Sequence, residues 1–148
     1  MSVDMNPQVT KRQRLLVQAS FEEIILEIDS FVDMFYEKLF ELDPSLTPLF
    51  SGDMQRQVRK VVQILLFAVN DIGNMYVLVP QIQEVAKRHV GYKVKEEYFV
   101  IVGQALIQSV GERLGPAFTN ELEEAWQTIY NTLATLMIEH MKSQGRHE

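Results

Sequence analysis

One histidine lies on the apolar stripe of a predicted helix. Ile82, Val85, Ala86 and His89 are spaced i, i+3, i+4 and i+7, which places the imidazole on the same helix face as three apolar side chains. A histidine in that position needs a partner. The partner is either a ligand that the imidazole binds or, as the alternative, a main-chain carbonyl that accepts its hydrogen bond inside the core.

Two polar side chains are also expected to face inward from other helices. Tyr36 shares a helix face with Val32 and Leu39. Gln57 presents a single amide on a face that is otherwise apolar, and its neighbours there are Val61, Leu65 and Ala68. Each residue alone has a structural explanation, because a buried tyrosine normally finds a carbonyl and a glutamine near a helix start is often solvated. Together they place two hydrogen-bond donors opposite one histidine.

The elements that carry these residues are predicted to be helices throughout the chain. Glycines (seven) and prolines (five) are few and lie between long segments of helical periodicity. The expected helices span residues 7–25, 27–41, 54–72, 80–89, 95–114 and 117–142, with a short helical turn and loop within 42–50. Segment 54–72 is apolar almost all round and is therefore expected to be central. Residues 1–6 and 143–148 are expected to be loose tails.

Several classes of enzyme site are excluded by the residues. No glycine pattern fits a phosphate-binding loop of the GxGxxG or GxxxxGK type. A carboxylate-bridged di-iron bundle requires Glu-x-x-His on two helices, but no histidine here follows a glutamate by three residues. The acidic doublets, such as Glu22-Glu23, point apart on a helix and are explained as solvated faces.

Composition limits the domain number, the compartment and the partners. A chain of 148 residues with 47% hydrophobic residues is expected to form a single domain, 1–148, with an ordered core at about 7–142. The net charge of −6 argues against nucleic acid or an acidic membrane as the main partner. The absence of cysteine excludes a disulfide framework, a cysteine nucleophile and thiolate metal sites. With no apolar run of 18 residues, we expect a cytoplasmic protein without a membrane span.

The joint spacing of these residues resembles the globin family, and within it the bacterial single-domain globins and the haem domains of flavohaemoglobins. Phe50 follows Pro44 by six residues and Tyr36 by fourteen. Gln57 begins the local pattern QVRKVV, and His89 follows it by 32 residues within VAKRHVGYKV. The similarity covers residues of about 10–140 and includes the last two helices, with Trp126 and Tyr130.

The resemblance implies an all-α globin fold, a three-over-three helical sandwich around haem b. It implies that His89 is the proximal iron ligand and that Tyr36 and Gln57 are distal donors to bound dioxygen. Further cofactor contacts are implied by the same resemblance; they are Phe50, Lys60, Val61, Arg88, Tyr92, Val94 and Phe99. For Lys60 and Arg88 an ordinary surface role is equally open.

The implied function is reversible binding of dioxygen at five-coordinate iron, with nitric oxide or carbon monoxide as further ligands and dioxygenation of nitric oxide to nitrate as an implied activity. Two departures bear on that activity. Phe99 stands where flavohaemoglobins carry a tyrosine ten residues after the proximal histidine, and no reductase domain follows in this sequence, so turnover is expected to need a separate reductase. The alternatives are a haem-based gas sensor or redox-signalling protein, and a helical interaction protein without a cofactor.

Replacing His89 with Gly is expected to abolish stable haem binding, because it removes the axial ligand. Added imidazole should partly restore binding to the ferrous form. Haemin titration and the ferrous-carbonyl spectrum measure both effects, with His140→Ala as the control for losing a histidine elsewhere. Wild-type haem affinity in His89→Gly without imidazole would contradict the assignment.

Overall fold

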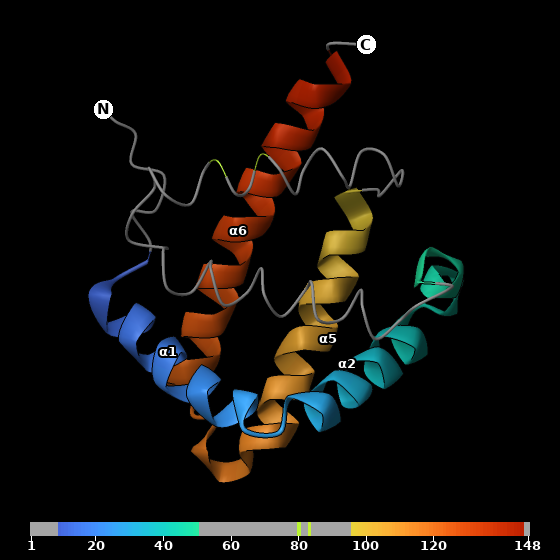
Figure 1. The fold of residues 1–148 in the computed structure, drawn as a ribbon. Helices are drawn as coiled ribbons and strands as arrows, with labels where there is room; N and C mark the ends of the chain where they lie inside the picture. The colour runs from blue at the N-terminus through green and yellow to red at the C-terminus, as the bar shows by residue number, and fades with distance from the viewer. Residues whose placement is uncertain (1–8, 51–79, 81–82, 84–95, 147–148) are drawn as a thin grey trace.

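The computed structural model describes residues 9–50, 80, 83 and 96–146, and every regular element among them is helical. The elements are two α-helices, a 3-10 helix, a further α-helix, a short 3-10 turn and a final α-helix. Their bounds are α1 Lys11–Ile25, α2 Ile28–Leu42, η1 Pro44–Phe50, α5 Glu96–Leu114, η2 Gly115–Ala117 and α6 Asn120–Arg146 (Figure 1). The predicted all-α class is confirmed. The expected helix over 54–72 and most of that over 80–89 lie outside the described residues.

The first helix begins later than the periodicity predicted. Thr10 is its N-cap: the Thr10 hydroxyl accepts a hydrogen bond from the Gln13 N–H at 3.0 Å, and the Gln13 side chain accepts one from the Thr10 N–H at 3.0 Å. This reciprocal pair is a capping box, which satisfies two main-chain donors that a helix start leaves without partners. The expected start at Pro7 is therefore wrong, because the signal for the helix start lies in the polar side chains of Thr10 and Gln13 and not in the apolar pattern.

The last helix both begins and ends later than predicted, since it starts at Asn120 and not at residue 117. It continues to Arg146, so the expected loose tail over 143–148 is wrong for residues 143–146. The predicted break at Gly115-Pro116 is confirmed: Gly115 has a φ of +57°, a conformation that costs glycine little, and η2 follows directly. This tight connection turns the chain from α5 into α6, which run side by side (Figure 1).

The core lies where α1 packs on α6 and α2 packs on α5, and α5 also packs on α6 (Figure 1). The largest completely or almost completely buried side chains come from all of these helices and from η1. They are Val17, Ile24, Leu39, Leu46, Val110, Trp126, Ile129 and Leu136. Burying side chains of this size contributes about 1.5–3 kcal/mol each relative to exposure, and Leu39 is among them, as the periodicity of the second helix predicted.

A chain of two buried hydrogen bonds connects α6 to α1. The Trp126 indole N–H donates to the Ser20 hydroxyl at 2.9 Å, and that hydroxyl donates to the Val17 carbonyl at 2.9 Å. The Phe21 ring meets the Trp126 ring edge-on, with centroids 6.2 Å apart. Every polar atom of this small network has a partner, so its burial carries no penalty for an unmade hydrogen bond.

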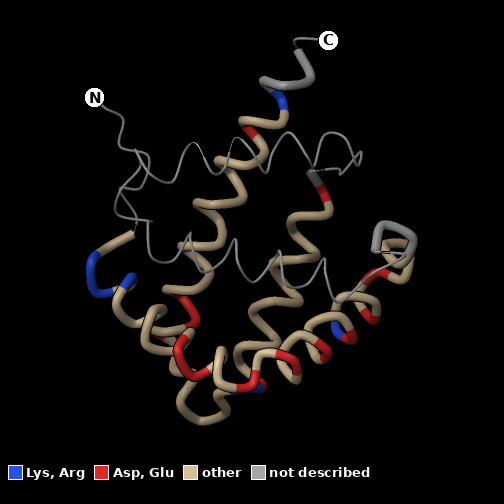
Figure 2. Tube along the Cα trace, in the orientation of Figure 1, with Lys and Arg blue, Asp and Glu red and all other residues tan. Residues whose placement is uncertain are grey.

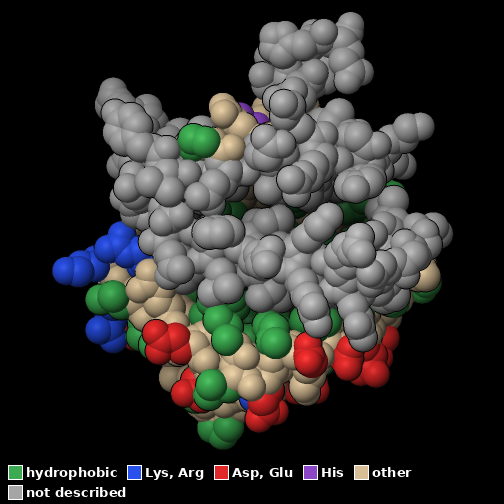
Figure 3. Space-filling model, viewed as in Figure 1, with side chains coloured by type: hydrophobic (Ala, Val, Ile, Leu, Met, Phe, Trp, Pro, Cys, Tyr) green, Lys and Arg blue, Asp and Glu red, His purple; other side chains and the backbone are tan. Residues whose placement is uncertain are grey.

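Ion pairs join the same helices at the surface. Lys38 of α2 pairs with Glu112 of α5 at 2.8 Å, and Arg113 of α5 pairs with Glu27, just before α2, at 3.0 Å. Arg12 of α1 forms a two-pronged contact with Glu121 of α6. Figure 2 shows acidic residues along the α1–α2 edge and basic residues at the start of α1, and Figure 3 shows their side chains on the surface there. Because at least one group of each pair is exposed to water, each pair contributes little stability.

Replacing Ser20 with Ala is expected to lower the free energy of unfolding by about 1–3 kcal/mol, because the Trp126 N–H loses its acceptor inside the core. Urea unfolding followed by tryptophan fluorescence measures this change. The matched control is Ser30→Ala, which alters an exposed serine of α2 and should change stability by less than about 0.5 kcal/mol. Equal stabilities of the two variants would show that the indole finds another acceptor.

Candidate functional site

Tyr36 lies inside an aromatic cluster on α2. It is only 6% exposed. Its ring stacks on that of Phe40, with centroids 5.7 Å apart and planes at 24°, and meets Phe35 edge-on at 5.6 Å. The phenol is therefore held in place by ring contacts within one helix. The predicted placement of Tyr36 on the buried face with Leu39 is confirmed.

Burial also fixes the protonation state of this tyrosine. Removal from water penalises the charged phenolate and raises the pKa of Tyr36 well above its ordinary value of 10.0. The hydroxyl carries its proton at neutral pH, as any ordinary tyrosine does, and burial extends the protonated range to higher pH. A protonated phenol can donate a hydrogen bond to a ligand, and its interaction is strongest where that ligand carries negative charge.

The segment after α2 places Phe50 at the end of a short 3-10 helix. The Asp43 carboxylate caps this helix: it accepts hydrogen bonds from the Ser45 N–H at 3.0 Å and the Ser45 hydroxyl at 2.6 Å. Leu46, 1% exposed, anchors the segment in the core. The short helical turn predicted from the two prolines is confirmed. The main chain of Phe50 ends η1, whereas its side chain lies outside what the structure describes.

Phe99 lies in the first turns of α5 and is half-buried. Its carbonyl accepts a hydrogen bond from the Tyr130 hydroxyl of α6 at 2.6 Å. Burial raises the pKa of Tyr130 above its ordinary value, so this hydroxyl also remains a donor. The sequence places Tyr130 only among the residues of the last helix. A tyrosine spaced with Trp126 and Leu133 on one face was the available signal.

The other predicted site residues lie outside the described residues. They are Gln57, Lys60, Val61, Arg88, His89, Tyr92 and Val94. Within residues 9–50, 80, 83 and 96–146, no three His, Cys, Asp or Glu side chains are grouped so that they could hold a metal ion. In the same part of the chain, none of the helices combines the length and apolar character of a membrane span.

Comparison with known proteins identifies the family. The globin family model matches residues 33–137, a range that contains Tyr36, η1, all of α5 and most of α6. The chain belongs to the globin family. The predicted globin fold is thereby confirmed, and membership of this family implies a haem cofactor.

Individual globins are similar over nearly all of the chain. Zebrafish (Danio rerio) neuroglobin is 26% identical over 95% of this chain and 98% of its own length. A flavohemoprotein of Bordetella parapertussis is 31% identical over 90% of the chain, which spans only 33% of that longer protein. A solved structure, an engineered carbene transferase from a candidate nitric oxide dioxygenase of Rhodothermus marinus, superposes with a TM-score of 0.83 at 26% identity, covering 94% of this globin and 97% of that chain.

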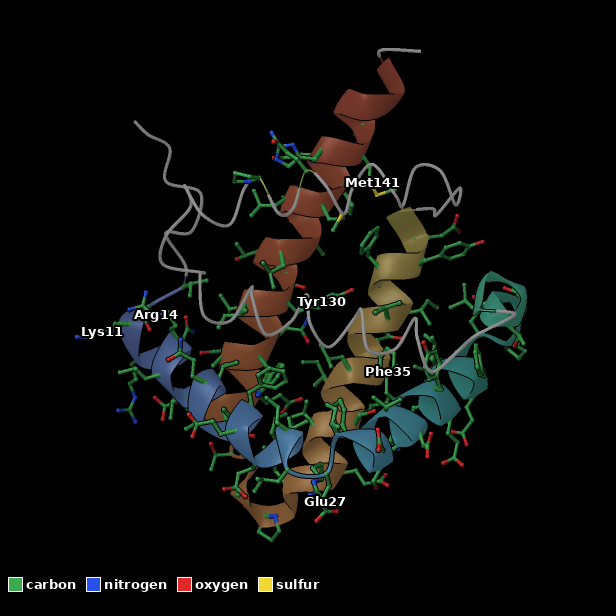
Figure 4. All side chains as sticks on the ribbon, in the orientation of Figure 1. Lys11, Arg14, Glu27, Phe35, Tyr130 and Met141 are labelled. Atoms are coloured by element: carbon green, nitrogen blue, oxygen red, sulfur yellow. The ribbon has the colours of Figure 1, made fainter. Side chains whose placement is uncertain are left out.

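The chemistry of the described residues suits a haem cofactor. A porphyrin is a large apolar plate, and α2 carries two buried aromatic rings: that of Phe35, which Figure 4 labels, and that of Tyr36. The Tyr36 hydroxyl is also suitable, because a neutral hydroxyl can donate a hydrogen bond to a ligand of iron and is itself a weak iron ligand.

The raised pKa of Tyr36 predicts a loss of stability in alkali. Since the folded-state pKa lies above the unfolded value, this contribution is complete below pH of about 10 and falls as pH rises towards the folded value. Tyr36→Phe should therefore flatten the alkaline decline in unfolding free energy, measured by urea unfolding across pH. Phe31→Leu, which alters the same buried face without a titrating group, should lower the whole curve and leave its slope unchanged. An unaltered slope in Tyr36→Phe would contradict the burial of the phenol.

Proposed function

We propose that this globin binds haem b through His89 and binds dioxygen reversibly at a five-coordinate iron. The observation that supports it best is Tyr36: a buried, protonated hydroxyl held among aromatic rings on α2, fourteen residues before Phe50. In the proposal, Tyr36 and Gln57 are the distal donors. Phe50, Val61, Tyr92, Val94 and Phe99 line the cofactor, and Lys60 and Arg88 lie near its propionates.

Haem supplies a ferrous iron that binds diatomic gases and shifts electron density onto them. The Tyr36 hydroxyl donates a hydrogen bond to the ligand, and the strength of that bond depends on the negative charge that the ligand carries. Dioxygen carries such charge and carbon monoxide carries little, so the tyrosine discriminates between the two gases. The Phe35 and Phe40 rings keep water from the phenol, which strengthens a hydrogen bond made there.

We further propose that the protein converts nitric oxide to nitrate. The balance is one nitric oxide, one dioxygen and one electron to one nitrate, so each turnover consumes one electron from a reductant. We propose a reduced flavoprotein as the electron donor. The similarity to flavohemoproteins supports this class of donor, since this chain spans a third of such a protein. Residues 1–148 would act as one globin domain in the cytoplasm, with a separate reductase as partner.

Tyr36→Phe should raise the dioxygen dissociation rate about 10- to 150-fold. A hydrogen bond to a charged acceptor contributes about 1.5–3 kcal/mol, and each 1.4 kcal/mol is about tenfold. Carbon monoxide dissociation should change much less, and it controls for a steric effect, which would alter both gases together. Gln57→Leu should give a smaller shift in the same direction. Stopped-flow displacement measures all of these rates. A dioxygen rate in Tyr36→Phe within a factor of two of wild type would show that the tyrosine is only structural.

A further inference from the structure

The first helix carries most of the exposed apolar side chains in the described part of the chain. Five large apolar side chains there are more than a third exposed, and three of them lie on α1 or directly after it. These three are Leu15, 52% exposed, Ile25, 37% exposed, and Leu26, 76% exposed. A single exposed apolar residue is ordinary on a protein surface, whereas a group on one element indicates a contact surface.

The exposed side chains of α1 are spaced as in a helix that packs on another helix. Leu15, Ala19, Glu22 and Leu26 are separated by four, three and four residues, the spacing that keeps side chains in one row along an α-helix. All four are exposed, and Leu26, the C-cap, keeps helical backbone angles. We call this row the outer face of α1. The small side chain of Ala19, between the two leucines, lets a second helix approach closely.

Opposite charges lie at the two ends of the outer face. Lys11 and Arg14 are in the first turn of α1, whereas Glu22 and Glu23 are in its last turn and Glu27 follows the helix. Figure 4 labels Lys11 and Arg14 at one end of α1 and Glu27 beyond the other end, and Figure 2 shows the basic residues at the start. A partner that fits this face must therefore carry the same charges in the opposite order.

The order of these charges is unfavourable for α1 alone. The start of a helix has partial positive charge and its end has partial negative charge, so acidic residues stabilise the start and basic residues the end. In α1 the first turn has no acidic residue and the last turn has no basic residue. An antiparallel neighbouring helix with the same charge order would offset this, because its acidic end would lie beside the basic start of α1.

We propose that two copies of this chain pack antiparallel through the outer face of α1 and form a weak symmetric dimer. In this arrangement Leu15 of each copy lies against Leu26 of the other, and Ala19 leaves room between them. The basic start of each helix faces the acidic end of the other, so the charge match is made twice. A parallel pair would bring like charges together. A second copy is the occupant that this face favours, because the face is complementary to itself when reversed.

The size of the contact makes this dimer weak. A helix of 15 residues is about 22 Å long, which provides an interface at the low end of the range for specific complexes. The net charge of −6 on each copy also opposes association. We therefore expect a dissociation constant on the order of 0.1 mM. The contact involves residues of α1 and Leu26 alone, so the inference does not rest on the proposed function.

Sedimentation equilibrium of the 148-residue chain measures the association from about 10 µM to about 1 mM. The weight-average mass should rise from that of one chain towards that of two and no further. Leu15→Gln and Leu26→Gln should each raise the dissociation constant about tenfold or more, as expected for apolar residues at the centre of an interface. The matched control is Val100→Gln, which alters an exposed apolar residue of α5 and should leave the association unchanged.

Charge reversal tests the antiparallel arrangement. One variant combines Lys11→Glu with Arg14→Glu, and its α1 is acidic at both ends; the other combines Glu22→Lys with Glu23→Lys, and its α1 is basic at both ends. Each variant alone should stay monomeric, whereas an equal mixture of the two should form a one-to-one heterodimer. General destabilisation cannot produce this rescue. If the Arg14 change impairs folding, as circular dichroism would show, Lys11→Glu is mixed with Glu22→Lys instead.

Four results overturn the inference. The first is a wild-type chain that stays monomeric at about 1 mM, which would leave the outer face of α1 to a different protein. The second is a mixture of the charge variants that associates no better than either variant alone. The third is a mass that grows beyond two copies, because this indicates open head-to-tail assembly. The fourth is an equal loss of association in Val100→Gln, because the contact would then not be specific to α1.

Discussion

The described part of this globin depends on how closely its neighbours approach α5. This helix packs on α1, α2 and α6, and its contact surface includes small residues beside larger ones such as Leu106 and Val110. Ala105 and Ser109 are completely buried, Gly103 lies under the Tyr130 ring, and Gly111 would meet the Phe118 ring at 3.0 Å through a Cβ. Small residues let helix axes come closer, so aromatic side chains from α6 and from the segment just before it can lie directly on the backbone of α5.

The sequence predicts the helices and the burial of Tyr36 well, because both follow from apolar periodicity. Apolar periodicity does not predict where a helix begins when a capping side chain sets the first residue, as Thr10 does for α1. Periodicity also does not predict the contact between Tyr130 and Gly103, which are 27 residues apart. Neither residue type indicates that the glycine leaves room for the tyrosine ring. For the site, spacing and resemblance predict the residue set, while only Tyr36 and Phe99 have described side chains.

Polar groups have two separate roles in this part of the structure. The exposed pairs, Arg12 with Glu121 and Arg113 with Glu27, lower the carboxylate pKa values through hydrogen bonds from arginine, but water weakens their contribution to stability. The hydroxyls of Ser20 and Tyr36, which are buried, and of Tyr130, which is half-buried, have individual roles. The first connects two helices, the second is offered to a ligand in the proposed function, and the third fixes the main chain of α5.

The close contact between Gly103 and Tyr130 also limits which substitutions the two positions can accept. A larger residue at position 103 is acceptable only after the ring at 130 has been lost, and a smaller residue at 130 leaves an empty space that glycine cannot fill. Either substitution made alone is expected to give a less stable protein. Among sequences that share this helix pair, the two positions are therefore expected to change together, as a single inherited unit.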